Sequence, residues 1–223
     1  MSQPPTRSKL AIKGSSKIVS DFFEFSIHSI LYQRGIYPPE DFKVVKKYGL
    51  NLLVSIDDEV INYVRRIMKQ LHRWIYSGKI SKLVLAITNK DTFETVEKWQ
   101  FDIESTSLPK TQQSEVNSPS DGSQQSNQEV EPKSKDQIQR EIQAIIRQIT
   151  ASITFLPELK KSESDEFTFN VLVYAKPNCK VPEDWADADA KEIEGGSVES
   201  VKFKSFQTDV HQVGTLVSYK IEE

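Results

Sequence analysis

Three histidines and one cysteine offer the broadest catalytic and metal-binding chemistry in this chain, and none of them stands in a known motif. His28, His72 and His211 are far apart, and no His-Glu-x-x-His zinc motif occurs. His28 lies beside the apolar stripe of an expected helix, as packed structural histidines do. Cys179 is the only cysteine, so neither a disulfide nor a cysteine-based zinc site can form within the chain. We interpret it as a bystander thiol in a turn.

Phosphate-binding and acid–base motifs are also missing. No Lys-Ser or Lys-Thr follows the Gly195–Gly196 pair, so this pair does not form a phosphate-binding loop. The acidic residues around it are more typical of a solvated loop than of a catalytic pair; they are Glu183, Asp184, Asp187, Asp189, Glu192 and Glu194. We therefore expect no catalytic, cofactor-binding or metal-binding residues, and we interpret the chain as a binding protein and not an enzyme.

Length and charge limit the classes of partner. The chain has 223 residues and a net charge of −3, which suits one well-cored domain and does not favour nucleic acid. The basic positions are scattered, and nearby acids favour a solvated helix face over the alternative of a nucleic-acid patch; they are Lys43, Lys46, Lys47, Arg65, Arg66 and Lys69. No signal peptide or membrane-spanning apolar run is present. We expect a soluble intracellular protein that binds neither nucleic acid nor membrane.

Three segments have the apolar period of amphipathic helices. They run from about Ser15 to Tyr32, from about Asp57 to Tyr76 and from about Lys135 to Leu156. Ser55 with Asp58 predicts the start of the second helix, and Ser134 with Gln137 predicts a capping box at the start of the third. The third stripe is long and regular, so we expect that helix to pack on a sheet.

Several segments have the pattern of strands. Lys82–Ile87 is almost entirely apolar, which predicts a strand buried on both faces. Alternating apolar residues predict the remaining strands; these are Glu97–Glu104, Phe167–Tyr174, a strand that starts at Val201 and Phe203, and Val213–Ile221. Between Ser105 and Lys133 the composition is polar, which predicts a disordered loop.

The order of these elements predicts the fold class. Helices, strands, a loop, a helix and further strands indicate an α+β domain with a mainly antiparallel sheet and helices on one face. We expect a single domain over residues 1–223, with a flexible N-terminus over residues 1–13.

Arg147 and Gln148 stand among isoleucines in the middle of the third expected helix. One interpretation is an ordinary exposed pair, because the apolar stripe passes through Ile145 and Ile149. An interface is an equally good interpretation, because arginine is frequent at interface hot spots.

Several segments of the amino-acid sequence closely resemble the spindle-checkpoint HORMA family of the mitotic-arrest-deficient type. The matching segments cover nearly the whole chain in the family's order; they are Ser29–Pro38, Lys47–Leu50, Lys98–Glu104, Ile146–Ala151, Thr154–Pro157, Val181–Trp185 and Val217–Ile221. The loop from Ser105 to Lys133 looks longer than in animal relatives, which leaves its role open.

The resemblance implies a HORMA fold, with three helices packed on one face of the sheet and a two-state C-terminal safety belt over about residues 175–223. In the open state the belt blocks the sheet edge, and in the closed state it crosses the sheet and holds a partner peptide against the freed edge. The implied edge-strand residues are Phe167, Phe169, Val171 and Val173. The implied belt residues are Trp185, Val201, Phe203, Phe206, Val213, Val217, Tyr219 and Ile221. Arg147 and Gln148 match the family's dimer contact, and the sequence does not indicate which state is present.

The implied function is a spindle-assembly checkpoint effector that captures the co-activator of the anaphase-promoting complex and delays anaphase. The other implied partners are a coiled-coil kinetochore receptor, a checkpoint kinase-like complex subunit, an AAA+ remodelling ATPase with its adaptor, and an open copy of the chain that pairs with a closed one. The implied location is the nucleus, with the kinetochore and spindle in mitosis and the nuclear envelope in interphase.

Two alternatives stay open. One is another HORMA adaptor, such as a translesion-polymerase subunit or a meiotic axis protein. The other is a small hydrolase that uses His211 with a serine, because such triads are recognised only in three dimensions. No nucleophile-elbow pattern accompanies that histidine.

Overall fold

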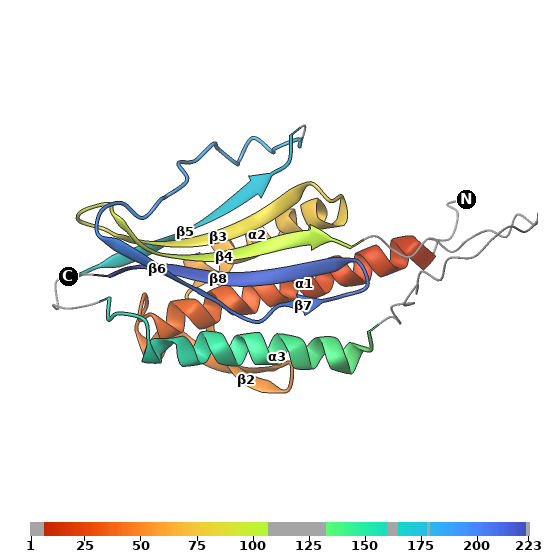
Figure 1. Ribbon diagram of the computed structural model, residues 1–223, viewed down its shortest axis with the longest axis horizontal. Coiled ribbons are helices and arrows are strands. Elements are labelled where there is room, and N and C mark those ends of the chain that lie inside the picture. The colour runs from red at the N-terminus through yellow and green to blue at the C-terminus, as the bar shows by residue number, and fades with distance from the viewer. Residues whose placement is uncertain (1–6, 107–132, 160–164, 178, 222–223) are drawn as a thin grey trace, which may run out of the picture.

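A computed structural model describes residues 7–106, 133–159, 165–177 and 179–221, and the fold is shown in Figure 1. Most of the predicted loop 105–133 therefore lies outside the described residues. Within the described part, no helix has the length and apolar content that crossing a bilayer requires.

The first helix is longer than its apolar period predicts. Helix α1 spans Arg7–Gln33, so residues 7–13 are helical and the expectation of a flexible segment through residue 13 is wrong for them. Arg, Lys, Leu and Ala are strong helix formers, and together they outweigh the cost of about 1 kcal/mol for Gly14 inside the helix. The Ser16 hydroxyl is satisfied within the helix, because it donates to the Ile12 carbonyl at 2.7 Å. Residues 1–6 lie outside the described residues.

A hairpin that the sequence patterns did not predict follows α1. A 3-10 turn (Pro39–Asp41) leads into β1 (Phe42–Lys47) and β2 (Leu50–Ser55), which pair antiparallel. Tyr48 and Gly49 both have positive φ, 53° and 71°, as the tightest hairpin turns require. The tip docks on the third helix, where the Gln143 side chain donates to the Tyr48 carbonyl.

The other two helices begin close to the predicted positions. Helix α2 spans Asp58–Tyr76, but its cap is Asp57, whose carboxylate accepts from the amides of Glu59 and Val60. The expected Ser55–Asp58 cap is wrong, because the Ser55 hydroxyl accepts from the Asp57 amide instead.

Helix α3 spans Lys135–Ala151, and Ser134 accepts from the Gln137 amide as predicted. A 3-10 turn over Ser152–Thr154 ends this helix before the expected Leu156. The Ser152 hydroxyl donates to the Ile149 carbonyl and the Thr154 hydroxyl to the Ala151 carbonyl, which competes with helical bonding.

The main sheet is antiparallel throughout. Its strands are β3 (Ile80–Asn89), β4 (Thr95–Ser105), β5 (Phe167–Ala175), β6 (Ser197–Lys202), β7 (Phe206–Gln207) and β8 (His211–Ile221). The spatial order is β5-β3-β4-β8-β6, and the short β7 also pairs with β8. Residues Leu83–Ile87 of β3 are buried, as the apolar run predicted.

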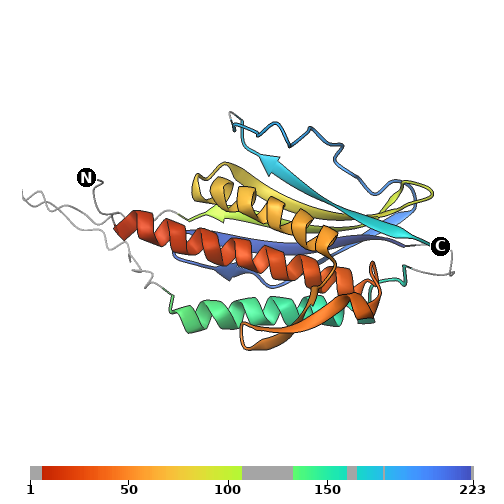
Figure 2. The same ribbon diagram turned by 180° about the vertical axis from the view of Figure 1, so that it is seen from behind.

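All three helices cover the same face of this sheet, with α1 between α2 and α3 (Figure 2). Phe22 and Phe23 of α1 lie 5.8 and 5.4 Å from the ring of Phe101 on β4, and Phe22 also lies 4.9 Å from Phe206. These contacts fill the layer between helix and sheet. The predicted α+β architecture, with helices on one face of a mainly antiparallel sheet, is confirmed.

Candidate functional site

Strand β5 forms one edge of the sheet. It pairs with β3 alone, and no strand among the described residues pairs with its other side. The side chains of Phe167, Phe169 and Val171 are buried on the helix-covered face. The Phe169 ring lies 5.5 Å from Tyr63 of α2 and 6.3 Å from Tyr37. These side chains therefore hold the strand in place, and what faces the open edge is backbone.

One hydrogen bond establishes which backbone groups point outward. The Val171 amide donates to the Tyr63 hydroxyl at 3.3 Å, so it points away from β3. In an antiparallel ladder the N–H and C=O of one residue point to the same side, and the side alternates along the strand. The outward groups are thus those of Phe167, Phe169, Val171 and Val173, the four residues predicted for the edge. Such an edge is a template for an added strand.

A long connection passes beside this edge. We call residues 176–196, which join β5 to β6, the crossing segment; it runs back along β5 in Figure 1. Near its start, the Lys180 carbonyl accepts from the Trp74 indole at 3.4 Å. The Trp185 ring lies 4.8 Å from Trp74 in an edge-to-face arrangement. The C-terminal half of α2 therefore anchors the first part of the crossing segment.

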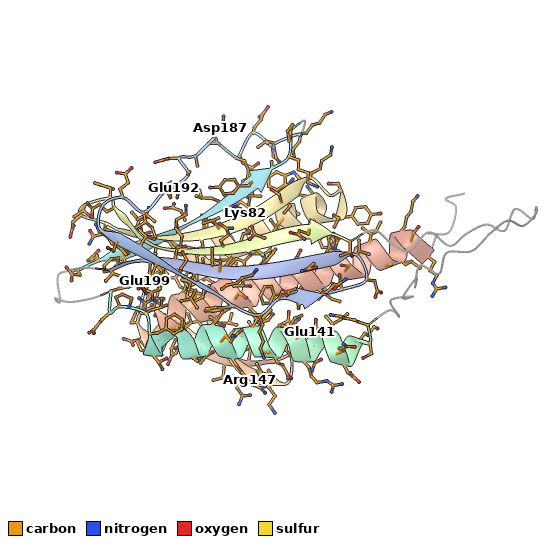
Figure 3. All side chains as sticks on the ribbon, in the orientation of Figure 1. Lys82, Glu141, Arg147, Asp187, Glu192 and Glu199 are labelled. Atoms are coloured by element: carbon orange, nitrogen blue, oxygen red, sulfur yellow. The ribbon has the colours of Figure 1, made fainter. Side chains whose placement is uncertain are left out.

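A second anchor lies on β4. The Lys98 ammonium donates to the Glu192 carboxylate at 2.8 Å and to the Ala190 carbonyl at 3.2 Å. Only 11% of the Lys98 side chain is exposed, so this is a partly buried ion pair. The outer edge of β5 lies between the two anchors, and Asp187 and Glu192 mark this side of the molecule in Figure 3. The crossing segment can therefore enclose a chain laid along β5.

The C-terminal strands lie at the opposite side of the sheet from β5. Strand β8 is central there, with β4 on one side and β6 on the other. All eight predicted belt residues contact the core. Phe203, Phe206, Val213, Val217 and Tyr219 are buried, whereas Trp185, Val201 and Ile221 are partly buried. This placement leaves β5 unblocked, and it matches the closed arrangement that the family resemblance implies.

The two residues predicted for self-association have different surroundings. Arg147 is exposed and projects from α3 (Figure 3). The Gln148 side-chain oxygen instead accepts from the Lys204 amide at 2.9 Å, in the connection between β6 and β7. Glu141, two turns earlier, accepts from the Gln207 amide at 3.1 Å. Helix α3 therefore presents a free surface and also holds the C-terminal segment.

His211 is brought to a serine, but the pair is buried. Its Nδ1 lies 2.6 Å from the Ser15 hydroxyl, and Ser15 and His211 are 5% and 2% exposed. Burial lowers the pKa of His211, and a hydrogen bond to the Ile75 backbone opposes this effect. Because the pair is enclosed, no substrate can reach it, and it does not support the hydrolase alternative. Its contacts instead join β8 to α1 and α2. Among the described residues, no cluster of three or more His, Cys, Asp or Glu could hold a metal ion.

Sequence reasoning missed one buried ion pair. Arg34, just after α1, donates to both carboxylate oxygens of Glu97 at 2.9 and 3.1 Å, and to the Pro157 carbonyl at 2.6 Å. The Trp99 indole donates to the same carboxylate at 2.6 Å. This network joins the end of α1, β4 and the segment that follows the 3-10 turn after α3. The partners are 63 residues apart, so no local pattern could have paired them.

Comparison with known proteins identifies the class. The chain matches the HORMA domain over residues 15–211, and it belongs to the HORMA-domain family. A structure of C. elegans HTP-1 bound to HTP-3 motif-1 has a TM-score of 0.67 at 15% identity, covering 94% of this chain and 91% of that one; it shares the fold alone.

Two further matches identify the branch. The mitotic spindle checkpoint component mad2 of Schizosaccharomyces pombe is 47% identical over 221 residues, 99% of either chain. A chain from the crystal structure of the Mitotic Checkpoint Complex has a TM-score of 0.76 and 44% identity, covering 94% of this chain and 100% of that one. Within the HORMA family, the chain therefore lies in the MAD2 branch of spindle checkpoint proteins.

Proposed function

We propose that this chain is a spindle-assembly checkpoint effector that works as a two-state peptide-binding switch and not as an enzyme. The observation that carries the proposal is the open edge of β5, whose outward backbone groups lie beside a crossing segment anchored at both ends. A peptide added there would pair with β5 and be enclosed by the crossing segment. The similarity to the S. pombe spindle checkpoint component supports the checkpoint assignment.

In the second, open state the C-terminal strands move to β5 and occupy the edge that a peptide would take. The change requires β8 to leave β4 and the buried Ser15–His211 contact to break. Gly195 and Gly196, with φ of 69° and 73°, give the chain a bend just before β6 that other residues rarely adopt. A packed core of this kind favours two discrete arrangements over a continuum.

Two proteins with similar short peptides compete for this edge: the coiled-coil kinetochore receptor and the co-activator of the anaphase-promoting complex. A closed copy bound to the receptor recruits an open copy through Arg147 and Gln148 of α3. The open copy then closes around the co-activator, joins a checkpoint kinase-like subunit, and delays anaphase. The similarity to a chain of the solved Mitotic Checkpoint Complex supports such an assembly.

Reopening is assigned to an AAA+ ATPase with an adaptor that pulls on the N-terminus. The Ser15–His211 contact supports this route, because it links the N-terminal half of α1 to the start of β8. Unwinding α1 up to Ser15 would release the C-terminal strands. The protein acts in the nucleus, at kinetochores and spindle in mitosis and at the nuclear envelope in interphase.

The test is a pull-down with the full chain, followed by sequencing of the bound peptides, on wild type and on Val173→Pro. The Val173 amide points outward, so proline there removes no bond to β3 but blocks strand addition. Leu172→Pro is the matched control, because its amide points toward β3 and its loss should lower the melting temperature. We expect Val173→Pro to stay folded and to lose the co-activator and receptor peptides. Equal recovery from wild type and Val173→Pro would refute binding along β5.

A further inference from the structure

The exposed sides of α1 and α2 carry only positive charge along much of their length. From Arg7 to Ser20 of α1 and from Val60 to Tyr76 of α2 no acidic residue occurs. Eight basic side chains project from these two stretches, and all are exposed; they are Arg7, Lys9, Lys13, Lys17, Arg65, Arg66, Lys69 and Arg73. The chain as a whole has a net charge of −3, so this is a strong local excess.

The charges form two stripes with helical spacing. On α1, Lys9, Lys13 and Lys17 are four residues apart, and each stripe of three covers about 12 Å at 1.5 Å per residue. On α2, Arg65, Lys69 and Arg73 repeat the spacing.

The two stripes lie on neighbouring helices that run antiparallel. Figure 2 shows α1 and α2 side by side. Burial and the charge of Asp21 raise the pKa of Glu24 on α1, and the charges of Lys47, of Arg65 on α2 and of Lys17 oppose that rise, so Glu24 lies within electrostatic reach of α2. At the other end, His211 contacts both Ser15 of α1 and the backbone of Ile75 of α2. The order of these contacts requires the N-terminal half of α1 to lie beside the C-terminal half of α2.

This arrangement weakens the helices that carry it. Like charges four residues apart destabilise a helix, and each stripe has two such pairs. Lys17 is compensated by Asp21 at 3.3 Å, whereas Lys69 and Arg73 have no ion pair with any residue that the structure describes. Sites that break a local stability rule without a visible gain are often functional.

We propose that the surface formed by these basic side chains of α1 and α2 binds an acidic helix of a partner protein, separately from the peptide held at β5. Acidic residues four positions apart on a helix are separated by about 6 Å along its axis, which is also the separation of the basic residues in both stripes. Three of the side chains on α2 are arginines, whose guanidinium groups pair with carboxylates in bidentate geometry.

The length of this basic surface favours a short helix over nucleic acid. Asp21 and Glu24 of α1, with Asp58 and Glu59 of α2, end the positive stretch on one side. A duplex would continue past this end onto those carboxylates, whereas a helix of a few turns would not. Among the described residues of a second copy, the densest group of acids is on the crossing segment, which has no helical structure and therefore lacks the matching repeat.

The test uses a labelled synthetic helix with glutamates at four-residue spacing and a scrambled peptide of the same composition. We expect the spaced peptide to bind the full chain at least tenfold more tightly than the scrambled one, with an affinity that falls as salt rises. Lys69→Glu/Arg73→Glu should weaken it at least tenfold. Lys135→Glu/Arg140→Glu makes the same charge change on the exposed side of α3 and should bind as wild type does.

Every other outcome overturns the proposal. Equal affinity for the spaced and scrambled peptides, or an equal loss of affinity in both variants, would mean that binding depends on net charge and not on the spacing of the charges. Tighter binding of a short DNA duplex or of anionic phospholipid vesicles, lost in Lys69→Glu/Arg73→Glu, would assign this basic surface to those partners. Loss of self-association in that variant, seen by sedimentation, would assign it to a second copy. A β5-peptide binding assay and a thermal melt on each variant separate these results from misfolding.

Discussion

The Val171 amide of the open edge donates to the Tyr63 hydroxyl of α2 at 3.3 Å. Tyr63 thus occupies the outward donor that a partner strand would otherwise bond. The Tyr63 ring also packs on Phe169, a buried residue of the same strand as Val171. Any peptide that pairs with Val171 must first displace this hydroxyl, so Tyr63 lowers the affinity for such a peptide.

Tyr63→Phe should therefore raise the affinity for a labelled co-activator peptide. The variant removes a bond from the free state only, and one such bond contributes about 0.5–1.5 kcal/mol, or roughly two- to tenfold in affinity. Tyr76→Phe, at the exposed end of α2, is the control and should change nothing. Fluorescence anisotropy gives both affinities; weaker binding by Tyr63→Phe would mean that the hydroxyl contacts the peptide itself.

The edge illustrates what sequence reasoning could reach. Alternation from Phe167 to Tyr174 predicted the strand, because apolar side chains on one face must be buried. It could not show that Tyr63, more than a hundred residues away, shields the Val171 amide. Long, periodic helices were predicted for the same reason as the strands, since their burial leaves a repeat in the sequence.

Features without such a repeat were missed. The hairpin β1–β2 exposes Lys43 and Val44, so its strands show little alternation. Its one local signal is Gly49, whose φ of 71° suits a tight turn. The bond from Lys204 to Gln148 joins positions 56 apart, and only the folded chain brings them together.

That bond leads to different predictions for the two neighbouring residues Arg147 and Gln148. Arg147→Glu should abolish self-association with little change in stability, because the side chain is exposed. Gln148→Ala should also loosen the C-terminal segment, since a lost hydrogen bond costs about 1 kcal/mol. Sedimentation measures the first effect, and hydrogen exchange at Lys204 measures the second. An unchanged dimer in Arg147→Glu, or faster exchange at Lys204 in that variant, would contradict this separation of roles.

Removing Gly214–Glu223 should shift the chain away from the closed arrangement. The cut removes most of β8, which holds β6 and pairs with β4 on its other side. Moving a population from mostly closed to mostly open requires roughly 5.5 kcal/mol. Val217 and Tyr219 are buried and Leu216 and Ile221 partly so, and burial stabilises by about 1.5–3 kcal/mol for each large apolar side chain.

The truncated chain should stay folded, run as a monomer and fail to retain the co-activator peptide, while still docking on a closed full-length copy through α3. Fluorescence binding of the labelled peptide to both chains measures the effect. Equal affinity in the two chains would contradict the role proposed for the C-terminal strands in holding the peptide. It would leave the assignment of the fold unchanged.

The last prediction concerns acid and His28. Burial lowers the pKa of His28 to about 4, and its Nδ1 accepts from the Ser55 amide at 3.4 Å, which requires the neutral ring. The unfolded chain has the ordinary value near 6.5, so it binds the proton first as the pH falls. Stability from neutral His28 is therefore complete above about pH 6.5 and is lost progressively down to about pH 4.

His28→Asn keeps an acceptor but does not titrate. The difference in unfolding free energy between wild type and variant should shrink by roughly 2–3 kcal/mol from pH 7 to pH 4.5. Urea unfolding across this range measures it, and a difference that is independent of pH would show that His28 titrates normally in the folded chain.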